Sequence, residues 1–222
     1  MKTISNLFIN VASIILFSVA VPCFADTTIG NVLVLGDSIS AGLGVKPERA
    51  WVQLFKREMQ EKYRLQVINA SVSGETSGGG KMRLNGLLKA HQPRLVIIEL
   101  GGNDGLRGLS TKTLESNLTE MVAQSHRSGA KVLLIGMRIP SSYGARYGNE
   151  FAAVYPAVAS ANHIPLLPFL LDKIALDPGL MQEDKIHPND KAQPQLLRNV
   201  MAVLEPYLKH QVGKKITTKK GR

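Results

Sequence analysis

The chain has 222 residues, of which 44% are hydrophobic and 20% are charged. This composition is that of a globular protein, so disorder over the whole length is excluded, and the length suits one domain with a substantial core. The formal net charge is +10, but Lys2 contributes one of these charges and residues 209–222 contribute six, which leaves +3 on residues 26–208. The body of the chain is therefore nearly neutral, which argues against nucleic acid as a partner.

The first 25 residues have the features of a secretory signal peptide. Lys2 precedes a mostly apolar run over residues 7–21, and Cys23 and Ala25 lie three residues and one residue before a suitable cleavage site. We expect cleavage after Ala25; a retained membrane anchor is the alternative, although a spanning helix needs roughly 20 apolar residues. Cleavage removes the only cysteine, so the mature chain is expected to have no disulfide, zinc–cysteine site or thiolate nucleophile.

Residues 209–222 form a basic C-terminal tail. They hold six lysines and arginines, no acid and few apolar residues. This composition predicts a solvated, disordered end. The alternative is weak attraction to the anionic headgroups of a membrane surface.

Between these ends, apolar runs of strand length alternate with stretches of helical periodicity. Strands are predicted for residues 31–35, 65–70, 95–100, 131–135 and 164–169, the last interrupted by prolines. Strands that alternate with helices in this way become parallel strands joined by helical crossovers. We therefore predict an α/β fold over residues 26–208, with one open parallel sheet of about five strands and helices on both faces. Such sheets bind ligands beyond the carboxyl ends of their strands.

Polar, glycine-rich segments occupy those predicted carboxyl ends. Three follow the first, second and third strands and one precedes the last helix, at residues 36–40, 71–76, 101–105 and 184–188. Taken singly, each candidate residue also has a structural interpretation: Ser38 and Asp184 would cap helices, Gly74 and Asn103 would be turn residues, and His187 would be a surface histidine. Taken together, they supply the hydroxyl, imidazole, carboxylate and amide donors of a serine hydrolase.

Other site motifs fail on inspection. Ser40 replaces the second glycine of Gly-x-Ser-x-Gly, so the usual α/β-hydrolase elbow is absent. Glu75 and Met82 replace the first glycine and the hydroxyl residue of a phosphate loop, and Pro47 replaces the third glycine of a dinucleotide fingerprint. The five histidines are widely separated, so we expect no metal.

The four polar segments resemble the blocks of the SGNH (GDSL-type) hydrolases, and they occur in the same order. Gly36-Asp37-Ser38 resembles the first block, Gly74 the second, Gly102-Asn103-Asp104 the third, and Asp184-x-x-His187 the last. The likeness covers nearly all of residues 30–208. Within the family it is closest to the periplasmic thioesterases and lysophospholipases, through residues 100–108, 138–147 and 186–189. The basic tail has no counterpart in this resemblance.

The resemblance implies a flavodoxin-like three-layer sandwich and a cofactor-free enzyme. Ser38 is the implied nucleophile, His187 its base and Asp184 the group that orients the histidine. The implied oxyanion hole comprises the backbone N–H groups of Ser38 and Gly74 and the side-chain amide of Asn103. At position 74 we expect a side chain to block close approach of the backbone. The implied reaction is hydrolysis of fatty acyl thioesters and esters, including lysophospholipids, by a periplasmic monomer.

Acyl chains need an apolar groove, and five residues near the catalytic loops are candidates to line it: Leu106, Leu109, Ile139, Pro140 and Tyr143. Ordinary loop packing is the alternative for each. Two other functions remain open at this point. A carbohydrate O-deacetylase would use the same residues without a long groove, and a binding protein would use the same sheet edge without needing a nucleophile.

Overall fold

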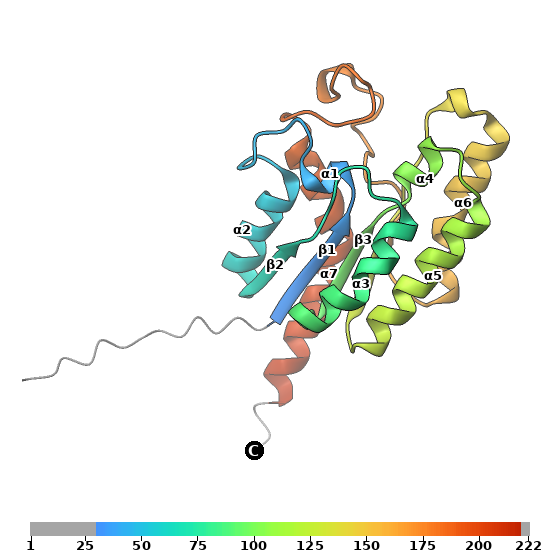
Figure 1. The fold of residues 1–222 in the computed structure, drawn as a ribbon. Coiled ribbons are helices and arrows are strands. Elements are labelled where there is room, and N and C mark those ends of the chain that lie inside the picture. The colour runs from blue at the N-terminus through green and yellow to red at the C-terminus, as the bar shows by residue number, and fades with distance from the viewer. Residues whose placement is uncertain (1–29, 219–222) are drawn as a thin grey trace, which may run out of the picture.

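The computed structural model describes residues 30–218, with side chains described as far as Leu208. Five parallel strands form one sheet: β1 (Gly30–Gly36), β2 (Leu65–Asn69), β3 (Leu95–Glu99), β4 (Lys131–Ile135) and β5 (Leu166–Leu167). Their spatial order is β2-β1-β3-β4-β5, of which β2, β1 and β3 are labelled in Figure 1. This is the flavodoxin-like order, so the predicted fold class is confirmed.

Helices cover both faces of the sheet (Figure 1). On one face, α3 packs against α5 and α5 packs against α6; on the other, α2 packs against α7. These five helices are α2 (Trp51–Tyr63), α3 (Ser77–His91), α5 (Thr111–Arg127), α6 (Ala145–Ala161) and α7 (Gln193–Thr218). Shorter helical segments at the carboxyl edge and in the loops are α1 (Ser38–Ala41), α4 (Gly102–Leu106), η1 (Ser141–Tyr143) and η2 (Pro178–Leu180).

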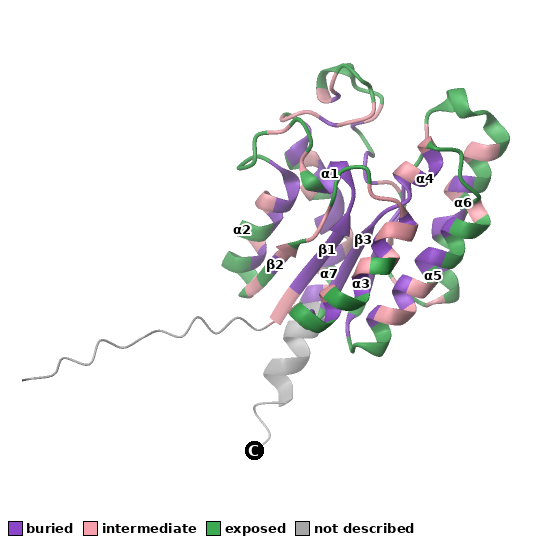
Figure 2. Cartoon of the chain, viewed as in Figure 1, coloured by how far each residue is buried: buried purple, intermediate pink, exposed green. Residues whose placement is uncertain are grey.

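The central strands form the core because both faces of the sheet are covered. Every residue of β3 is buried, and β1 is buried from Val32 onward (Figure 2). The last strand, β5, is only two residues long because Pro165 and Pro168 bracket it and have no N–H to donate to the ladder.

The strand order reverses between β1 and β3. The chain passes from β1 to β2 on one side, and β3 pairs with β1 on the other side. The segments that follow β1 and β3 therefore leave the sheet at a topological switch point, where open α/β sheets bind ligands.

The predictions for the two ends of the chain have different outcomes. The predicted signal peptide, residues 1–25, lies outside the described residues. At the other end, the backbone of α7 continues as a helix to Thr218, whereas a disordered tail was predicted from residue 209. Lysine and glutamine are good helix formers, so the loss of apolar periodicity did not by itself end the helix. Within residues 30–218, no helix has the length and apolarity needed to cross a membrane.

Candidate active site

Ser38 lies where the first strand turns into a short helix. Gly36 ends β1, and Ser38 is the first residue of α1. Asp37, not Ser38, caps this helix, because its Oδ1 accepts a hydrogen bond from the backbone N–H of Ile39 at 3.0 Å. The Ser38 side chain is therefore left available, although the residue as a whole is buried.

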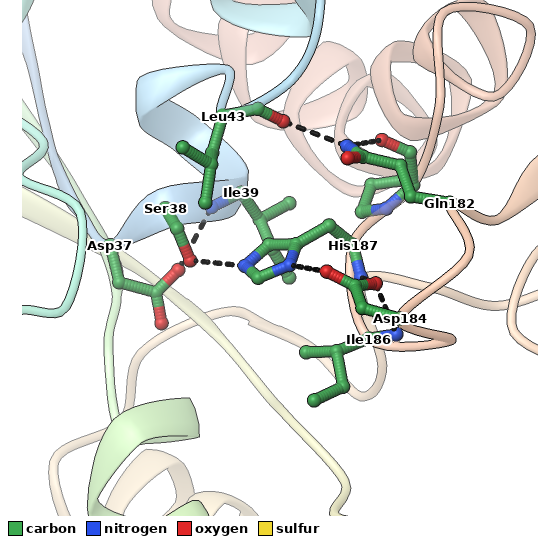
Figure 3. A network of polar contacts seen from close by, with 9 residues as sticks. Asp37, Ser38, Ile39, Leu43, Gln182, Asp184, Ile186 and His187 are labelled. Carbon is green, nitrogen blue, oxygen red and sulfur yellow. Dashed lines mark hydrogen bonds and ion pairs between the residues drawn. The ribbon is translucent and has the colours of Figure 1, made fainter.

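Ser38, His187 and Asp184 form one chain of hydrogen bonds (Figure 3). The Oγ of Ser38 lies 2.8 Å from Nε2 of His187, and Nδ1 of the same ring lies 2.6 Å from Oδ2 of Asp184. Residues 149 positions apart in the sequence thus meet at the carboxyl edge of the sheet. A hydroxyl, an imidazole and a carboxylate in this order are the parts needed to activate a serine.

His187 and Asp184 belong to the loop between β5 and α7, which closes on itself as a small hairpin. Met181 and Pro188 form an antiparallel bridge, and the N–H of Gln182 donates to the carbonyl of His187 at 2.8 Å. The hairpin presents the half-buried His187 toward α1, and α7 begins well after it at Gln193. Asp184 is therefore not the cap of the last helix, which was its structural interpretation.

One side chain ties this hairpin to the segment that follows Ser38. Nε2 of Gln182 donates to the carbonyl of Leu43 at 2.8 Å and to the carbonyl of Pro188 at 3.1 Å (Figure 3). A Cβ added to Gly44 would lie 2.3 Å from the Gln182 amide oxygen. Glycine at position 44 therefore leaves room for the side chain that joins the histidine loop to the serine segment.

The carboxyl group of Asp184 is held ionised by donors from its own loop. Partial burial acts to raise its pKa, but the backbone N–H of His187, the His187 ring and the backbone N–H of Ile186 outweigh it and lower the pKa to about 2. Both N–H groups lie 2.9 Å from Oδ1, which leaves Oδ2 for the imidazole. An ionised carboxylate at this position fixes the orientation of the imidazole ring.

Two backbone N–H groups and one side-chain amide near the carboxyl edge of the sheet are potential donors to an oxyanion. Within residues 30–218, the N–H groups of Ser38 and Gly74 donate no hydrogen bond to the protein. The loop that carries Gly74 is tied to the end of β1 by the bond from Val72 N–H to the Gly36 carbonyl, at 3.0 Å. The amide Nδ2 of Asn103 donates to Oδ2 of Asp37 at 3.3 Å, and Asn103 lies within α4 instead of in a turn.

Glycine at position 74 is explained by its backbone conformation and not by crowding within the protein. Its φ is +80°, in the region that favours glycine. An added Cβ would lie 3.9 Å from its nearest neighbour, Nη2 of Arg107, which is an ordinary contact. The interpretation as a turn glycine with positive φ is therefore correct, and the expectation that a side chain here would block close approach of the backbone stays a prediction.

A buried pair of carboxyl groups lies behind Ser38, and the sequence analysis missed it. Asp37 and Glu99 are 2% and 0% exposed. Oε2 of Glu99 accepts hydrogen bonds from Ser40 Oγ at 2.5 Å and from the Asp37 N–H at 3.2 Å. Glu99 is paired with Gly36 across β1 and β3, and a Cβ on Gly36 would lie 2.5 Å from Oε2 of Glu99.

Burial raises the pKa of both carboxyl groups. The pKa of Asp37 rises to about 6, with hydrogen bonds from Ile39 and Asn103 and the nearby His187 opposing the effect of burial. The pKa of Glu99 rises well above its ordinary value, first through burial and second through the neighbouring Asp37. Both effects disfavour the charged form of Glu99. In the sequence, the signal that could have identified Glu99 is an acidic residue near the end of an otherwise apolar strand.

An apolar cavity of about 600 Å³ opens beside Ser38 and His187. Of the five residues predicted to hold an acyl chain, Leu106, Ile139 and Pro140 line it, whereas Leu109 and Tyr143 do not. The Tyr143 hydroxyl instead donates to the carbonyl of Leu106 at 2.9 Å. The apolar lining residues that were not predicted are Ile39, Met137, Phe169, Leu171, Ala175, Leu176, Met181 and Ile186. Most of them lie in the loop between β5 and α7 that carries His187, where the sequence predicted only polar site residues.

Comparisons with known proteins indicate the family of the chain. The model of the GDSL-like lipase/acylhydrolase family matches residues 34–193. The chain is 49% identical to esterase TesA of Pseudomonas aeruginosa, over 80% of this chain and 89% of that protein. It is 42% identical to thioesterase 1/protease 1/lysophospholipase L1 of Escherichia coli, over 84% of this chain and 89% of that protein.

The fold comparison gives the same result. A crystal structure of TesA matches with a TM-score of 0.77 at 49% sequence identity, covering 79% of this chain and 98% of that one. The family model spans most of the chain, and both relatives match nearly their whole length. The chain therefore belongs to the GDSL-like lipase/acylhydrolase family, as its four ordered motifs predicted.

Proposed function

We propose that this enzyme, a serine hydrolase of esters and thioesters, works through an acyl-enzyme formed on Ser38. The hydrogen-bonded chain from Ser38 through His187 to Asp184 carries the proposal. In the first step, Ser38 Oγ attacks the acyl carbonyl carbon while Nε2 of His187 takes the hydroxyl proton. The bond to the leaving oxygen or sulfur then breaks, and the histidine returns the proton to that atom.

Water completes the cycle by the same route. Nε2 of His187 removes a proton from a water molecule, whose oxygen attacks the acyl carbon of the ester on Ser38. The carbon–oxygen bond to Ser38 breaks, and its Oγ regains the proton. Asp184 stays ionised throughout because its loop donors keep the pKa low, and it stabilises the imidazolium that forms in each half of the cycle.

The negative charge that develops on the carbonyl oxygen needs donors that are already in place. We assign this role to the N–H groups of Ser38 and Gly74 and the amide of Asn103. The N–H groups of Ser38 and Gly74 donate no hydrogen bond within residues 30–218. The amide of Asn103 is oriented by Asp37. Fixed donors aimed at the transition state stabilise it without reorganisation during the reaction.

The proposed substrates are fatty acyl esters and thioesters, including lysophospholipids. Two observations support this class. The cavity beside Ser38 has a volume of about 600 Å³ and a largely apolar lining, which suits an acyl chain. One relative is described as a thioesterase and lysophospholipase and another as an esterase. An O-deacetylase would have no use for an apolar cavity of this size, so we place it second.

We also propose a periplasmic location for the mature enzyme. Support comes from the signal-like sequence of residues 1–25, with its charged start, apolar run and small residue at the cleavage site. The intact mass of protein secreted by a bacterial host tests the proposal, and a mature chain that starts after Ala25 is expected. A species that retains residues 1–25 contradicts it.

A rate series over acyl length tests the proposed function. Glycerol or thiol esters with chains of two to sixteen carbons are compared, with the Ser38→Ala variant as the blank. We expect kcat/KM to rise with chain length as methylene groups enter the apolar cavity. Activity confined to acetyl esters favours the O-deacetylase. Activity equal to that of the Ser38→Ala blank on every ester overturns the proposal.

A further inference from the structure

The cavity beside the proposed nucleophile has an apolar floor and a charged mouth. Met137, Leu171 and Met181 are buried and form part of its lining. The charged residues of the lining are exposed, with the exception of Asp37. An acyl chain bound to the buried floor would therefore leave the other side of its ester directed toward the exposed mouth.

Three of the charged residues at the mouth are cations: Arg138, Lys173 and Lys185. We call them the cationic rim. Asp172 is the one exposed acid among the lining residues, which leaves a surplus of two positive charges. This surplus is local, because residues 26–208 as a whole carry only +3.

The cations of the rim have no acidic partner within residues 30–208. None of the three forms an ion pair there. The guanidinium carbon of Arg138 lies 5.0 Å from the centre of the Phe169 ring, which also lines the cavity. Stacking on an aromatic face holds the guanidinium in place and leaves its N–H groups free to donate.

The backbone at two rim positions adopts a conformation that few non-glycine residues adopt. Lys173 has a φ of 61° and Lys185 a φ of 57°. Of the three other described non-glycine residues with positive φ, Arg64 and Gln92 directly follow helices and His163 lies two residues after one, where a left-handed residue is the ordinary way to end a helix. The two lysines instead lie in turns of the loop between β5 and α7, and both line the same cavity.

We propose that the cationic rim binds a negatively charged group on the leaving side of the substrate, such as a phosphate. The enzyme then favours acyl esters with an anionic leaving group over neutral esters with the same acyl chain. This inference rests on the proposed function, because it requires the acyl carbonyl at Ser38 and the acyl chain on the apolar floor. Unpaired cations at the mouth attract the anion during approach, and free donors hold it once it is bound.

The test compares two soluble esters that differ in one charged group: 1-hexanoylglycerol and 1-hexanoylglycerol 3-phosphate. The six-carbon chain keeps both in solution as monomers, so attraction to a lipid surface does not contribute. At low ionic strength we expect kcat/KM to be about tenfold higher or more for the phosphate ester. Salt should reduce this ratio, because the Debye length falls from about 30 Å at 0.01 M to about 3 Å at 1 M.

Variants then locate the effect. The combined substitution Arg138→Gln, Lys173→Gln and Lys185→Gln should bring the ratio of the two kcat/KM values close to one. The ratio is taken within each protein, so a general loss of folded enzyme cancels. The matched control is Lys56→Gln, Lys89→Gln and Lys131→Gln, which removes the same charge from exposed residues outside the cavity lining and should keep the wild-type ratio.

The outcomes separate this inference from the proposed function. A wild-type ratio near one at low salt overturns the rim inference, and so does a rim variant that keeps the wild-type ratio or a control variant that loses it. In each of these cases, hydrolysis of both esters above the Ser38→Ala blank leaves the proposed function standing. If neither ester is hydrolysed above that blank, the proposed function falls and the rim inference falls with it.

Discussion

The candidate site has two halves that shift the pKa of a carboxyl group in opposite directions. The sheet half comprises the segment around Ser38 together with Glu99 and Asn103, and the loop half is the hairpin that carries Asp184 and His187. In the sheet half, Asp37 sits beneath Ser38 and is 2% exposed, and burial raises its pKa to about 6. In the loop half, the side chain of Asp184 is 43% exposed, and hydrogen bonds from its own hairpin lower its pKa to about 2. The core of the protein sets the pKa of Asp37, whereas the four residues 184–187 set the pKa of Asp184.

This difference indicates how each half is held in place. The sheet half is built from segments that are far apart in the sequence, because Asp37 contacts Asn103 and Glu99 through the pairing of β1 with β3. The loop half assembles its acid and its histidine locally, and it joins the sheet half through Gln182 and the contact of His187 with Ser38. Substitutions in the two halves should therefore impair catalysis and stability in different ways.

Loss of the histidine should have the largest effect. In His187→Ala the hydroxyl of Ser38 has no base, so kcat for a short-chain ester should fall by about 10⁶-fold. The fold should be retained, because the imidazole lies on a loop and not in the core. Steady-state kinetics with circular dichroism as the folding control check this. A loss smaller than about tenfold would mean that another group accepts the proton.

The second prediction concerns the acid of the loop half. In Asp184→Asn the imidazole remains but loses the partner that selects its tautomer, so kcat should fall by about 10⁴-fold. The defect should thus be smaller than that of His187→Ala. Kinetics on the same ester provide the measurement. Equal losses in the two variants would argue that Asp184 is required to build the hairpin rather than to orient a ring that stays in place.

The third prediction moves to the sheet half. Asn103→Ala removes one proposed oxyanion donor, and kcat should fall by about 10²- to 10³-fold with little change in KM. The reason is that this amide acts mainly on charge present in the transition state. Measuring kcat and KM separately decides the matter. A change confined to KM would assign Asn103 to ground-state binding of the substrate.

The smallest predicted effects concern stability. The change of stability with pH should have opposite signs for Asp37 and Asp184. The raised pKa of Asp37 means that its stabilising contribution is complete below about pH 4 and is lost as the pH rises to about 6. A shift of this size corresponds to about 3 kcal/mol. The lowered pKa of Asp184 means that its contribution is complete above about pH 4 and is lost as the pH falls toward 2.

Urea unfolding across this pH range separates the two carboxyl groups. Asp37→Asn should flatten the decline in the free energy of unfolding between pH 4 and 6, and Asp184→Asn should flatten the decline below pH 4. The wild-type protein, measured in parallel, is the reference. If Asp37→Asn leaves the decline between pH 4 and 6 unchanged, the account of a buried carboxyl group with a raised pKa next to Ser38 is incorrect.

Much of the fold and of the loop half could be predicted from the sequence. Continuous apolar runs mark buried strands, and alternation with helices makes those strands parallel, which brings their carboxyl ends to one edge. Asp184 and His187 lie three residues apart, and a single turn of chain is enough to join them. The contact of His187 with Ser38 followed from the sheet-edge rule and from the motif order of the family.

The parts that could not be predicted depend on register and on side-chain direction. Glu99 faces Asp37 because β1 and β3 pair with Gly36 opposite Glu99, and periodicity alone does not set the register of two apolar strands. Leu109 and Tyr143 follow the catalytic loops in the sequence, but they do not line the cavity. Loop conformation decides such contacts, and neither composition nor spacing determines it.

The most direct measurement of the central claim is covalent labelling with a fluorophosphonate. An ordinary serine hydroxyl does not react appreciably, so the reagent reports a serine that has both a base and an oxyanion hole. We predict one adduct per chain, located on Ser38 by peptide mapping, and no adduct in His187→Ala. An adduct on Ser71, Ser73 or Ser77, or labelling that persists in His187→Ala, would contradict the account.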